Sequence, residues 1–139
     1  MALKLKKTVN QLCAEAEKEI QTITPQEAIK LKDDPGVLLV DIRDIRELQR
    51  DGRVPGALHA PRGMLEFWVD PESPYYKEVF GSGKKFMFFC AGGMRSALAA
   101  RVGSHPHTSH EYANRDWANS SAVPRGSELF TTSSQSRMN

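Results

Sequence analysis

Two short runs of residues that are apolar at every position limit what this chain can fold into. They are Val37 to Val40 and Phe86 to Phe89, four residues each. A strand with one face in water alternates apolar and polar residues, so continuous runs of this kind are typical of strands covered on both faces. Helical patterns lie before, between and after the two runs, and such alternation indicates a parallel sheet. We therefore predict a three-layer α/β/α fold with a parallel sheet of four to five strands.

Turn and capping residues mark the predicted helices. Thr24 is suited to cap a helix, Pro25 to its first position and Glu27 to completing a capping box. This helix should end near Lys32, because residues 33–36 have the composition of a turn. The other predicted elements are a helix over 44–50, a weak strand over 57–60, a partly helical connection over 62–80 and a helix over 96–101.

The N-terminal residues 1–20 predict an amphipathic helix that precedes an α/β domain at 21–101. Apolar residues recur at spacings of three and four, which places them on one face of a helix over 4–20. They are Leu5, Val9, Leu12, Ala16 and Ile20. Cys13 lies beside this face and has two interpretations, a small buried apolar side chain or a resolving thiol for Cys90.

Residues 102–139 form an atypical polar tail. Ser, His, Asn, Thr and Arg dominate it, Ile is absent, and no strand-like run exceeds Leu129–Phe130. Residues 123–127 resemble a protease-cleavage linker. A disordered segment, a shifted reading frame and vector-derived sequence remain open as explanations. For His105, His107 and His110, which have no thiols nearby, we expect solvated loop positions and no metal site.

Composition excludes several functional classes. A formal net charge of +2 is too small to indicate nucleic acid or a membrane surface as a partner. No apolar run approaches the roughly 20 residues of a membrane-spanning helix. The basic residues 1–7 are not followed by the apolar stretch of a signal peptide, so we expect a cytoplasmic protein. Two cysteines are too few for a disulfide framework.

The segment after the second apolar run carries the candidate chemistry. Its residues are Cys90, Ala91, Gly92, Gly93, Met94, Arg95 and Ser96. In parallel sheets, ligands bind at the carboxyl ends of strands. The two glycines allow a sharp turn, so that the N–H groups of residues 91–95 point inward as an anion-binding nest before the next helix. These donors, with the Ser96 hydroxyl, would stabilise a nucleophilic Cys90 thiolate, and Arg95 would hold the loop or an incoming oxyanion.

This segment resembles the active-site loop of the rhodanese-like family, whose members carry sulfane sulfur on a cysteine. Three further segments resemble family motifs in the same order: Ile23 to Ala28, Leu38 to Arg43 with Glu47, and Val54 to Pro61. The resemblance covers residues 20–101 and implies that Cys90 is the catalytic residue. It implies a sulfurtransferase that takes sulfur from thiosulfate or a similar small anionic donor as a Cys90 persulfide. The acceptor is a thiol or cyanide, and no metal or organic cofactor is needed.

Two polar residues after the first strand are further candidates. Asp41 either fixes the active loop through its backbone amides or caps the turn after its own strand. Arg43 steers the anionic donor, or is a solvated surface arginine, or pairs with Glu47 four residues later. Both are counted here among the substrate-binding candidates, together with the residues of the loop.

Loop length bears on the type of reaction. Four residues separate Cys90 from Arg95, one fewer than in the loops of cysteine phosphatases that share the rhodanese fold. The shorter ring favours sulfur over phosphate or arsenate. A rhodanese-like binding or regulatory module without catalysis and a small cysteine phosphatase or arsenate reductase remain the alternatives.

The tail departs from the family pattern. In the family, a further parallel strand follows the active-site helix and lies inside the sheet, beside the strand that carries the cysteine. Residues after 101 offer no clear equivalent, and Glu128 to Thr132 is the nearest candidate. Without that strand, backbone groups beside the active loop would lack partners. We therefore expect either an unrecognised strand in the tail or an incomplete sheet.

Overall fold

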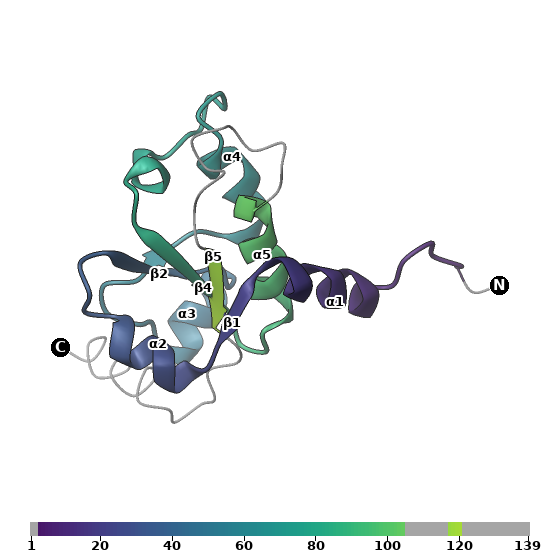
Figure 1. Cartoon of the computed structure of the whole chain (residues 1–139), viewed down its shortest axis with the longest axis horizontal. Coiled ribbons are helices and arrows are strands. Elements are labelled where there is room, and N and C mark those ends of the chain that lie inside the picture. The colour runs from purple at the N-terminus through teal and green to yellow at the C-terminus, as the bar shows by residue number, and fades with distance from the viewer. Residues whose placement is uncertain (1–2, 105–116, 121–139) are drawn as a thin grey trace.

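A parallel sheet forms the centre of the computed structural model, which describes residues 3–104 and 117–120. Its strand order is β1-β5-β4-β2-β3, and every pairing is parallel. The strands are β1 (Gln21–Ile23), β2 (Val37–Asp41), β3 (Leu58–His59), β4 (Lys85–Phe89) and β5 (Trp117–Ser120). The predicted parallel α/β sheet is thus confirmed (Figure 1).

Helices precede and connect the strands, and several of them begin at a capping side chain. They are α1 (Val9–Glu19), α2 (Pro25–Leu31), α3 (Ile45–Asp51), α4 (Leu65–Val69) and α5 (Met94–Ser104), with short 3-10 turns η1 (Arg62–Met64) and η2 (Glu78–Gly81). Thr24 caps α2 as predicted, since its Oγ1 accepts from the Glu27 N–H at 3.2 Å. Asp44 caps α3 with a complete capping box, in which Glu47 also bonds back to the Asp44 N–H.

Both faces of the sheet are covered, which gives the three layers. Phe86 and Phe88 of β4 pack in one cluster with residues of α4 and α5, and Met87 and Phe89 pack in another with residues of α2. All four β4 side chains are at most 1% exposed. Neither face of β4 meets water, so residues 86–89 can be apolar at every position.

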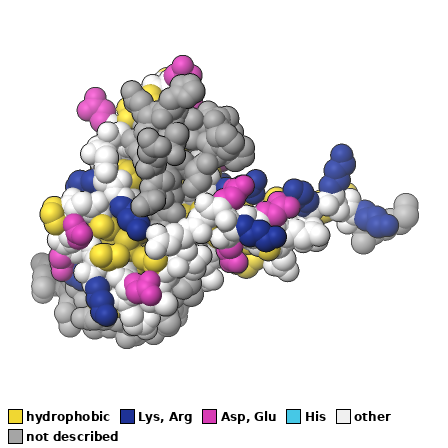
Figure 2. Space-filling model, viewed as in Figure 1, with side chains coloured by type: hydrophobic (Ala, Val, Ile, Leu, Met, Phe, Trp, Pro, Cys, Tyr) yellow, Lys and Arg dark blue, Asp and Glu magenta, His cyan; other side chains and the backbone are white. Residues whose placement is uncertain are grey.

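The N-terminal helix is shorter than the predicted span over 4–20. Thr8 is extended, with φ −83° and ψ 163°, and its capping box with Gln11 begins α1 at Val9. The predicted apolar face is therefore only partly used: Leu5 and Val9 are 61% and 54% exposed, while Cys13 and Ala16 are buried. Figure 1 shows α1 and the segment before it extending away from the sheet. In Figure 2, the outer part of this extension carries only Lys and Arg among its charged side chains, and Asp and Glu side chains lie closer to the sheet.

Strand β5 comes from the tail, where the sequence suggested no strand at these positions. It lies between β1 and β4, with Ala118 in register with Gln21 on one side and Met87 on the other. Of the two alternatives, an unrecognised strand in the tail is therefore confirmed, at other residues than 128–132, and the incomplete sheet is wrong. Pattern reasoning missed β5 because a four-residue strand with parallel neighbours on both sides is held by backbone pairing, without a β-branched run. Residues 128–132 and the three tail histidines lie outside the described residues.

Candidate functional site

Cys90 lies at the carboxyl end of β4, between a buried strand and the first turn of α5. Strands β2 and β4 end together, since Asp41 is in register with Phe89, and the Ile42 N–H donates to the Phe89 carbonyl oxygen at 3.2 Å. Residues 90–96, called the Cys90 loop below, turn the chain from the sheet into α5. The turn depends on Gly93, whose φ of 89° lies in a region that side chains strain.

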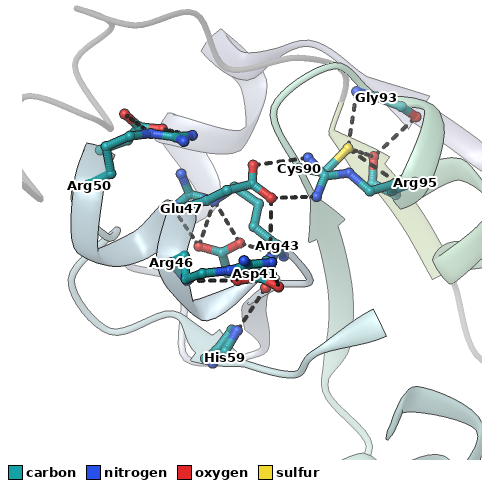
Figure 3. A network of polar contacts seen from close by, with 12 residues as sticks. Asp41, Arg43, Arg46, Glu47, Arg50, His59, Cys90, Gly93 and Arg95 are labelled. Carbon is teal, nitrogen blue, oxygen red and sulfur yellow. Dashed lines mark hydrogen bonds and ion pairs between the residues drawn. The ribbon is translucent and has the colours of Figure 1, made fainter. Parts of the chain in front are cut away.

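Backbone N–H groups point at the Cys90 sulfur. Within the described residues, Gly93 N donates to Sγ at 3.1 Å and Ser96 N at 3.4 Å (Figure 3). The Cys90 Sγ donates to the Ser96 Oγ at 3.4 Å, and this hydroxyl donates its own hydrogen to the Gly93 carbonyl oxygen at 3.2 Å. The Ser96 hydroxyl therefore does not donate to the sulfur as predicted. Two amide dipoles at a helix N-terminus favour a negative charge on the sulfur. Cys90 is 1% exposed, and shielding from water strengthens such interactions.

The rim of the Cys90 loop is open and uncharged. Ala91, Gly92 and Met94 are exposed, with Met94 at 44%. A Cβ placed on Gly92 would meet no atom within 4 Å. The predicted loop residues therefore divide into two groups: Gly93 and Ser96 contact the sulfur, and Ala91, Gly92 and Met94 form the rim.

Arg95 is held by Glu47, a residue of α3. Its Nη1 donates to Glu47 Oε1 at 2.6 Å and its Nη2 to Oε2 at 3.1 Å (Figure 3). The side-chain hydrogen bond from Arg95 is the largest cause that lowers the pKa of Glu47. The same bond raises the pKa of Arg95, and the charges of Cys90 and Asp41 raise it further. Arg95 thus fastens the Cys90 loop to α3, one of the two roles expected for it.

Asp41 and Arg43 form a buried ion pair beside the end of β4. Arg43 Nη2 lies 2.7 Å from Asp41 Oδ2, and the two side chains are 1% and 2% exposed. Arg43 also donates to the Gly52 carbonyl oxygen at 2.9 Å, and its guanidinium lies 6.0 Å from the Phe89 ring centroid. Arg43 therefore does not lie on the surface where a donor anion would arrive.

Asp41 caps the turn after its own strand, the second of its two predicted roles. Its Oδ1 accepts from the Arg43 N–H at 3.1 Å. The turn is also bonded by His59, whose Nε2 lies 2.8 Å from the Arg43 carbonyl oxygen. Asp41 and Arg43 support Phe89, the residue before Cys90, from within the protein.

Cys13 lies against the first turn of α5. Its Sγ is 3.6 Å from the Met94 carbonyl oxygen, and the residue is 6% exposed. Burial is the largest cause that raises the pKa of this thiol, and the charges of Glu17 and Cys90 raise it further. The position agrees with the interpretation of Cys13 as a small buried side chain.

The partner of Arg95 was missed at the level of the sequence. Glu47 belongs to the segment that resembles a family motif, and its spacing of four residues predicts a pair with Arg43 instead. Arg95 lies 48 positions away, and no local pattern connects them. Its position at the third residue of α3, where it also completes the capping box of Asp44, is the one local sign that its side chain is oriented.

The described residues bring together a buried cysteine whose sulfur accepts two N–H hydrogen bonds and an arginine at the edge of the same loop. No group of three or more His, Cys, Asp or Glu side chains in the described part of the chain is arranged to hold a metal ion. None of the described helices is both long and apolar enough to cross a membrane.

Comparisons with known proteins agree with this geometry. A model of the rhodanese-like domain family matches residues 24–114. A structure from Rhodopseudomonas palustris, of a protein of unknown function described as a possible tyrosine phosphatase, is 40% identical with a TM-score of 0.78, over 88% of this chain and 90% of that one. A comparison with curated proteins finds no significant match.

Two sulfurtransferase structures share the fold. The human single-domain sulfurtransferase is 24% identical, with a TM-score of 0.51, over 73% of this chain and 90% of that one. The polysulfide-sulfur transferase homodimer of Wolinella succinogenes is 24% identical, with a TM-score of 0.54, over 78% and 73%. The strand order, the Cys90 loop and the family match together establish that this chain belongs to the rhodanese-like domain family.

Proposed function

We propose that this chain is a sulfurtransferase that carries sulfane sulfur as a persulfide on Cys90. The observation that supports this most directly is the pair of N–H groups, from Gly93 and Ser96, that donate to the Cys90 sulfur. They favour the thiolate that attacks a donor and the negatively charged persulfide that results. An intact cysteine and arginine weigh against a binding module without catalysis.

The reaction has two half-reactions. The Cys90 thiolate attacks the outer sulfur of thiosulfate or a similar donor, a new S–S bond forms, and sulfite leaves with the electron pair of the broken S–S bond. The persulfide then lies within the Cys90 loop. An acceptor, a thiolate or cyanide, attacks its outer sulfur, and the Cys90 thiolate is the leaving group. The proposed setting is the cytoplasm, where the two free thiols would stay reduced.

A second candidate is phosphatase activity, and the relative that is 40% identical and described as a possible tyrosine phosphatase favours it. Against it stands the loop itself. Four residues separate Cys90 from Arg95, and the Arg95 guanidinium is bound on one edge by Glu47. A phosphate bound to this site would have to compete with that carboxylate.

One experiment separates the two functions. The protein is incubated with thiosulfate, freed of excess donor and measured by intact mass. We expect a gain of about 32 Da, one sulfur atom, on the wild type and on Cys13→Ser, and no gain on Cys90→Ser. Hydrolysis of an aryl phosphate is measured in parallel. A folded wild type that gains no sulfur from any donor and hydrolyses the aryl phosphate in a Cys90-dependent manner would overturn the sulfur-transfer proposal.

A further inference from the structure

The positively charged side chain of the Cys90 loop is already bonded to a carboxylate. The four residues between Cys90 and Arg95 are uncharged. The cation of the loop, Arg95, is bound at two nitrogens by Glu47. Its side chain is 42% exposed and that of Glu47 19%, so the pair lies at the edge of the loop and not in the core. The site therefore presents a neutral ion pair to a donor.

The neighbouring arginines are paired in the same way (Figure 3). Arg43 is buried against Asp41. Arg46 binds Asp44 at 2.9 Å, and this bond is the largest cause that lowers the pKa of Asp44 to about 2. Each arginine labelled in Figure 3 thus has its own carboxylate, and within the described part of the chain the N–H groups at the sulfur are the donors without a negative partner of their own.

We propose that Glu47 sets the charge of the donor: by neutralising Arg95 it makes this site take monoanionic sulfane-sulfur donors, such as organic thiosulfonates and persulfides, in preference to dianionic thiosulfate. This inference rests on the proposed sulfur transfer at Cys90. Glu47 acts through Arg95 and is a positioning residue, since its carboxylate is bonded to Arg95 and to the Asp44 N–H.

The physical reason is the charge that must be brought next to a thiolate. A dianion is repelled by the Cys90 thiolate about twice as strongly as a monoanion at the same distance. It must also give up more hydration, which only a charged partner offsets. The two N–H groups at the sulfur, from Gly93 and Ser96, can stabilise about one negative charge. The rim favours the same class of donor, because the exposed Met94 side chain would contact an apolar substituent and cannot bind a second sulfonate charge.

Methanethiosulfonate is the probe for donor charge, since it is thiosulfate with one anionic oxygen replaced by a methyl group and carries one negative charge in place of two. The Cys90 thiolate attacks its outer sulfur, a Cys90 persulfide forms, and methanesulfinate leaves with the electron pair. Thiosulfate gives the same persulfide and sulfite. The persulfide is the common product, so the two donors differ only in the charge and size of the leaving group.

The experiment measures kcat/KM for both donors and takes their ratio in each variant. Glu47→Gln keeps an acceptor for Arg95 and removes the negative charge. We expect the KM for thiosulfate to fall and the ratio to shift toward thiosulfate by roughly tenfold, as expected for one charge-assisted interaction. Arg95→Gln leaves the Glu47 carboxylate unpaired and should move the ratio in the opposite direction. Glu47→Asp, which restores the carboxylate, should restore the wild-type preference.

A matched control removes a carboxylate from another Arg–Glu pair. Arg62 of η1 and Glu66 of α4 are joined at the same 2.6 Å, and Glu66→Gln should leave the donor ratio unchanged. The inference is overturned if folded Glu47→Gln keeps the wild-type ratio. If that variant does not fold, the direction of the Arg95→Gln shift decides instead. A wild type that forms no persulfide with either donor contradicts the sulfur-transfer proposal itself, whereas persulfide formation with an unchanged ratio contradicts only the role of Glu47.

Discussion

The two cysteines of this chain are both buried free thiols, yet the backbone groups that face their sulfur atoms carry partial charges of opposite sign. Cys90 is 1% exposed and accepts hydrogen bonds from two N–H groups. Cys13 is 6% exposed and lies against the Met94 carbonyl oxygen. N–H groups stabilise a thiolate, and a carbonyl oxygen stabilises a protonated thiol that can donate. The comparison teaches that the direction of the backbone dipoles, more than burial, separates a candidate nucleophile from a packing residue.

The regions that carry the two thiols are also supported differently. The Cys90 loop follows Phe89, which is backed by the buried pair of Asp41 and Arg43. Helix α1, which carries Cys13, is joined to α5 by Glu19 and Arg101 at 3.1 Å, with side chains 53% and 25% exposed. Buried pairs are costly to break, and exposed pairs contribute little.

The largest effect should follow from breaking the buried pair. Asp41→Asn leaves the Arg43 charge buried without its carboxylate, and we expect the free energy of unfolding to fall by about 3–5 kcal/mol. Urea denaturation followed by circular dichroism measures this change. A loss below about 1 kcal/mol would show that the support beneath Phe89 is no stronger than a surface contact.

The next largest effect should come from the turn that aims an N–H group at Cys90. Gly93→Ala forces a side chain onto a residue with φ 89°, at a cost of about 1–3 kcal/mol. Because its N–H group bonds the sulfur, we also expect persulfide formation to slow by tenfold or more, roughly the effect of a misplaced anion-stabilising donor. Stopped incubations with thiosulfate, analysed by intact mass, give this rate.

Gly92→Ala is the matched control for that variant. Its new Cβ meets open space, and the position has no positive φ. Stability and the rate of persulfide formation should stay within about twofold of the wild type. Equal losses in the two variants would mean that the loop tolerates no side chain at all, and that the Gly93 N–H group has no special role.

A smaller effect is expected at the other thiol. Cys13→Ser should form persulfide at about the wild-type rate. In Cys90→Ser, the raised pKa of Cys13 keeps its thiol protonated, so alkylation by iodoacetamide should stay slow at neutral pH and accelerate only as pH rises beyond the range of an ordinary thiol. A disulfide or mixed product that requires both cysteines during turnover would support the resolving-thiol interpretation instead.

The smallest effect belongs to the exposed pair that ties α1 to α5. Glu19→Gln should lower the free energy of unfolding by less than about 1 kcal/mol, because both side chains reach solvent. Chemical denaturation at low and at high salt measures it. A loss as large as that of Asp41→Asn would remove the distinction between the two regions.

Burial patterns explain which parts of the fold and site were predictable. The apolar runs located β2 and β4 to within a residue, since only a doubly covered strand tolerates them. The two glycines after Cys90 predicted inward N–H groups from residues 91–95, and Gly93 supplies one because turn geometry is local. The second comes from the Ser96 backbone, one residue beyond the predicted range. The Glu47–Arg95 pair and the inward direction of Arg43 depend on how α3 packs beside the loop. The spacing of apolar residues in the sequence does not predict that packing. Strand β5 was missed for another reason: backbone pairing with β1 and β4 holds it, and its four residues show no strand pattern.

The position of β5 has a consequence for how this chain folds. Gln21 pairs with Ala118. A strand near the start of the chain can therefore pair only after a strand almost 100 residues later has been synthesised. Such pairing gives the sheet a high contact order and a slow loop-closure step. During synthesis, β4 would leave the ribosome with an unpaired edge beside its cysteine until the last strand arrives. That interval is when a nascent chain of this topology is most exposed to aggregation and to chaperones.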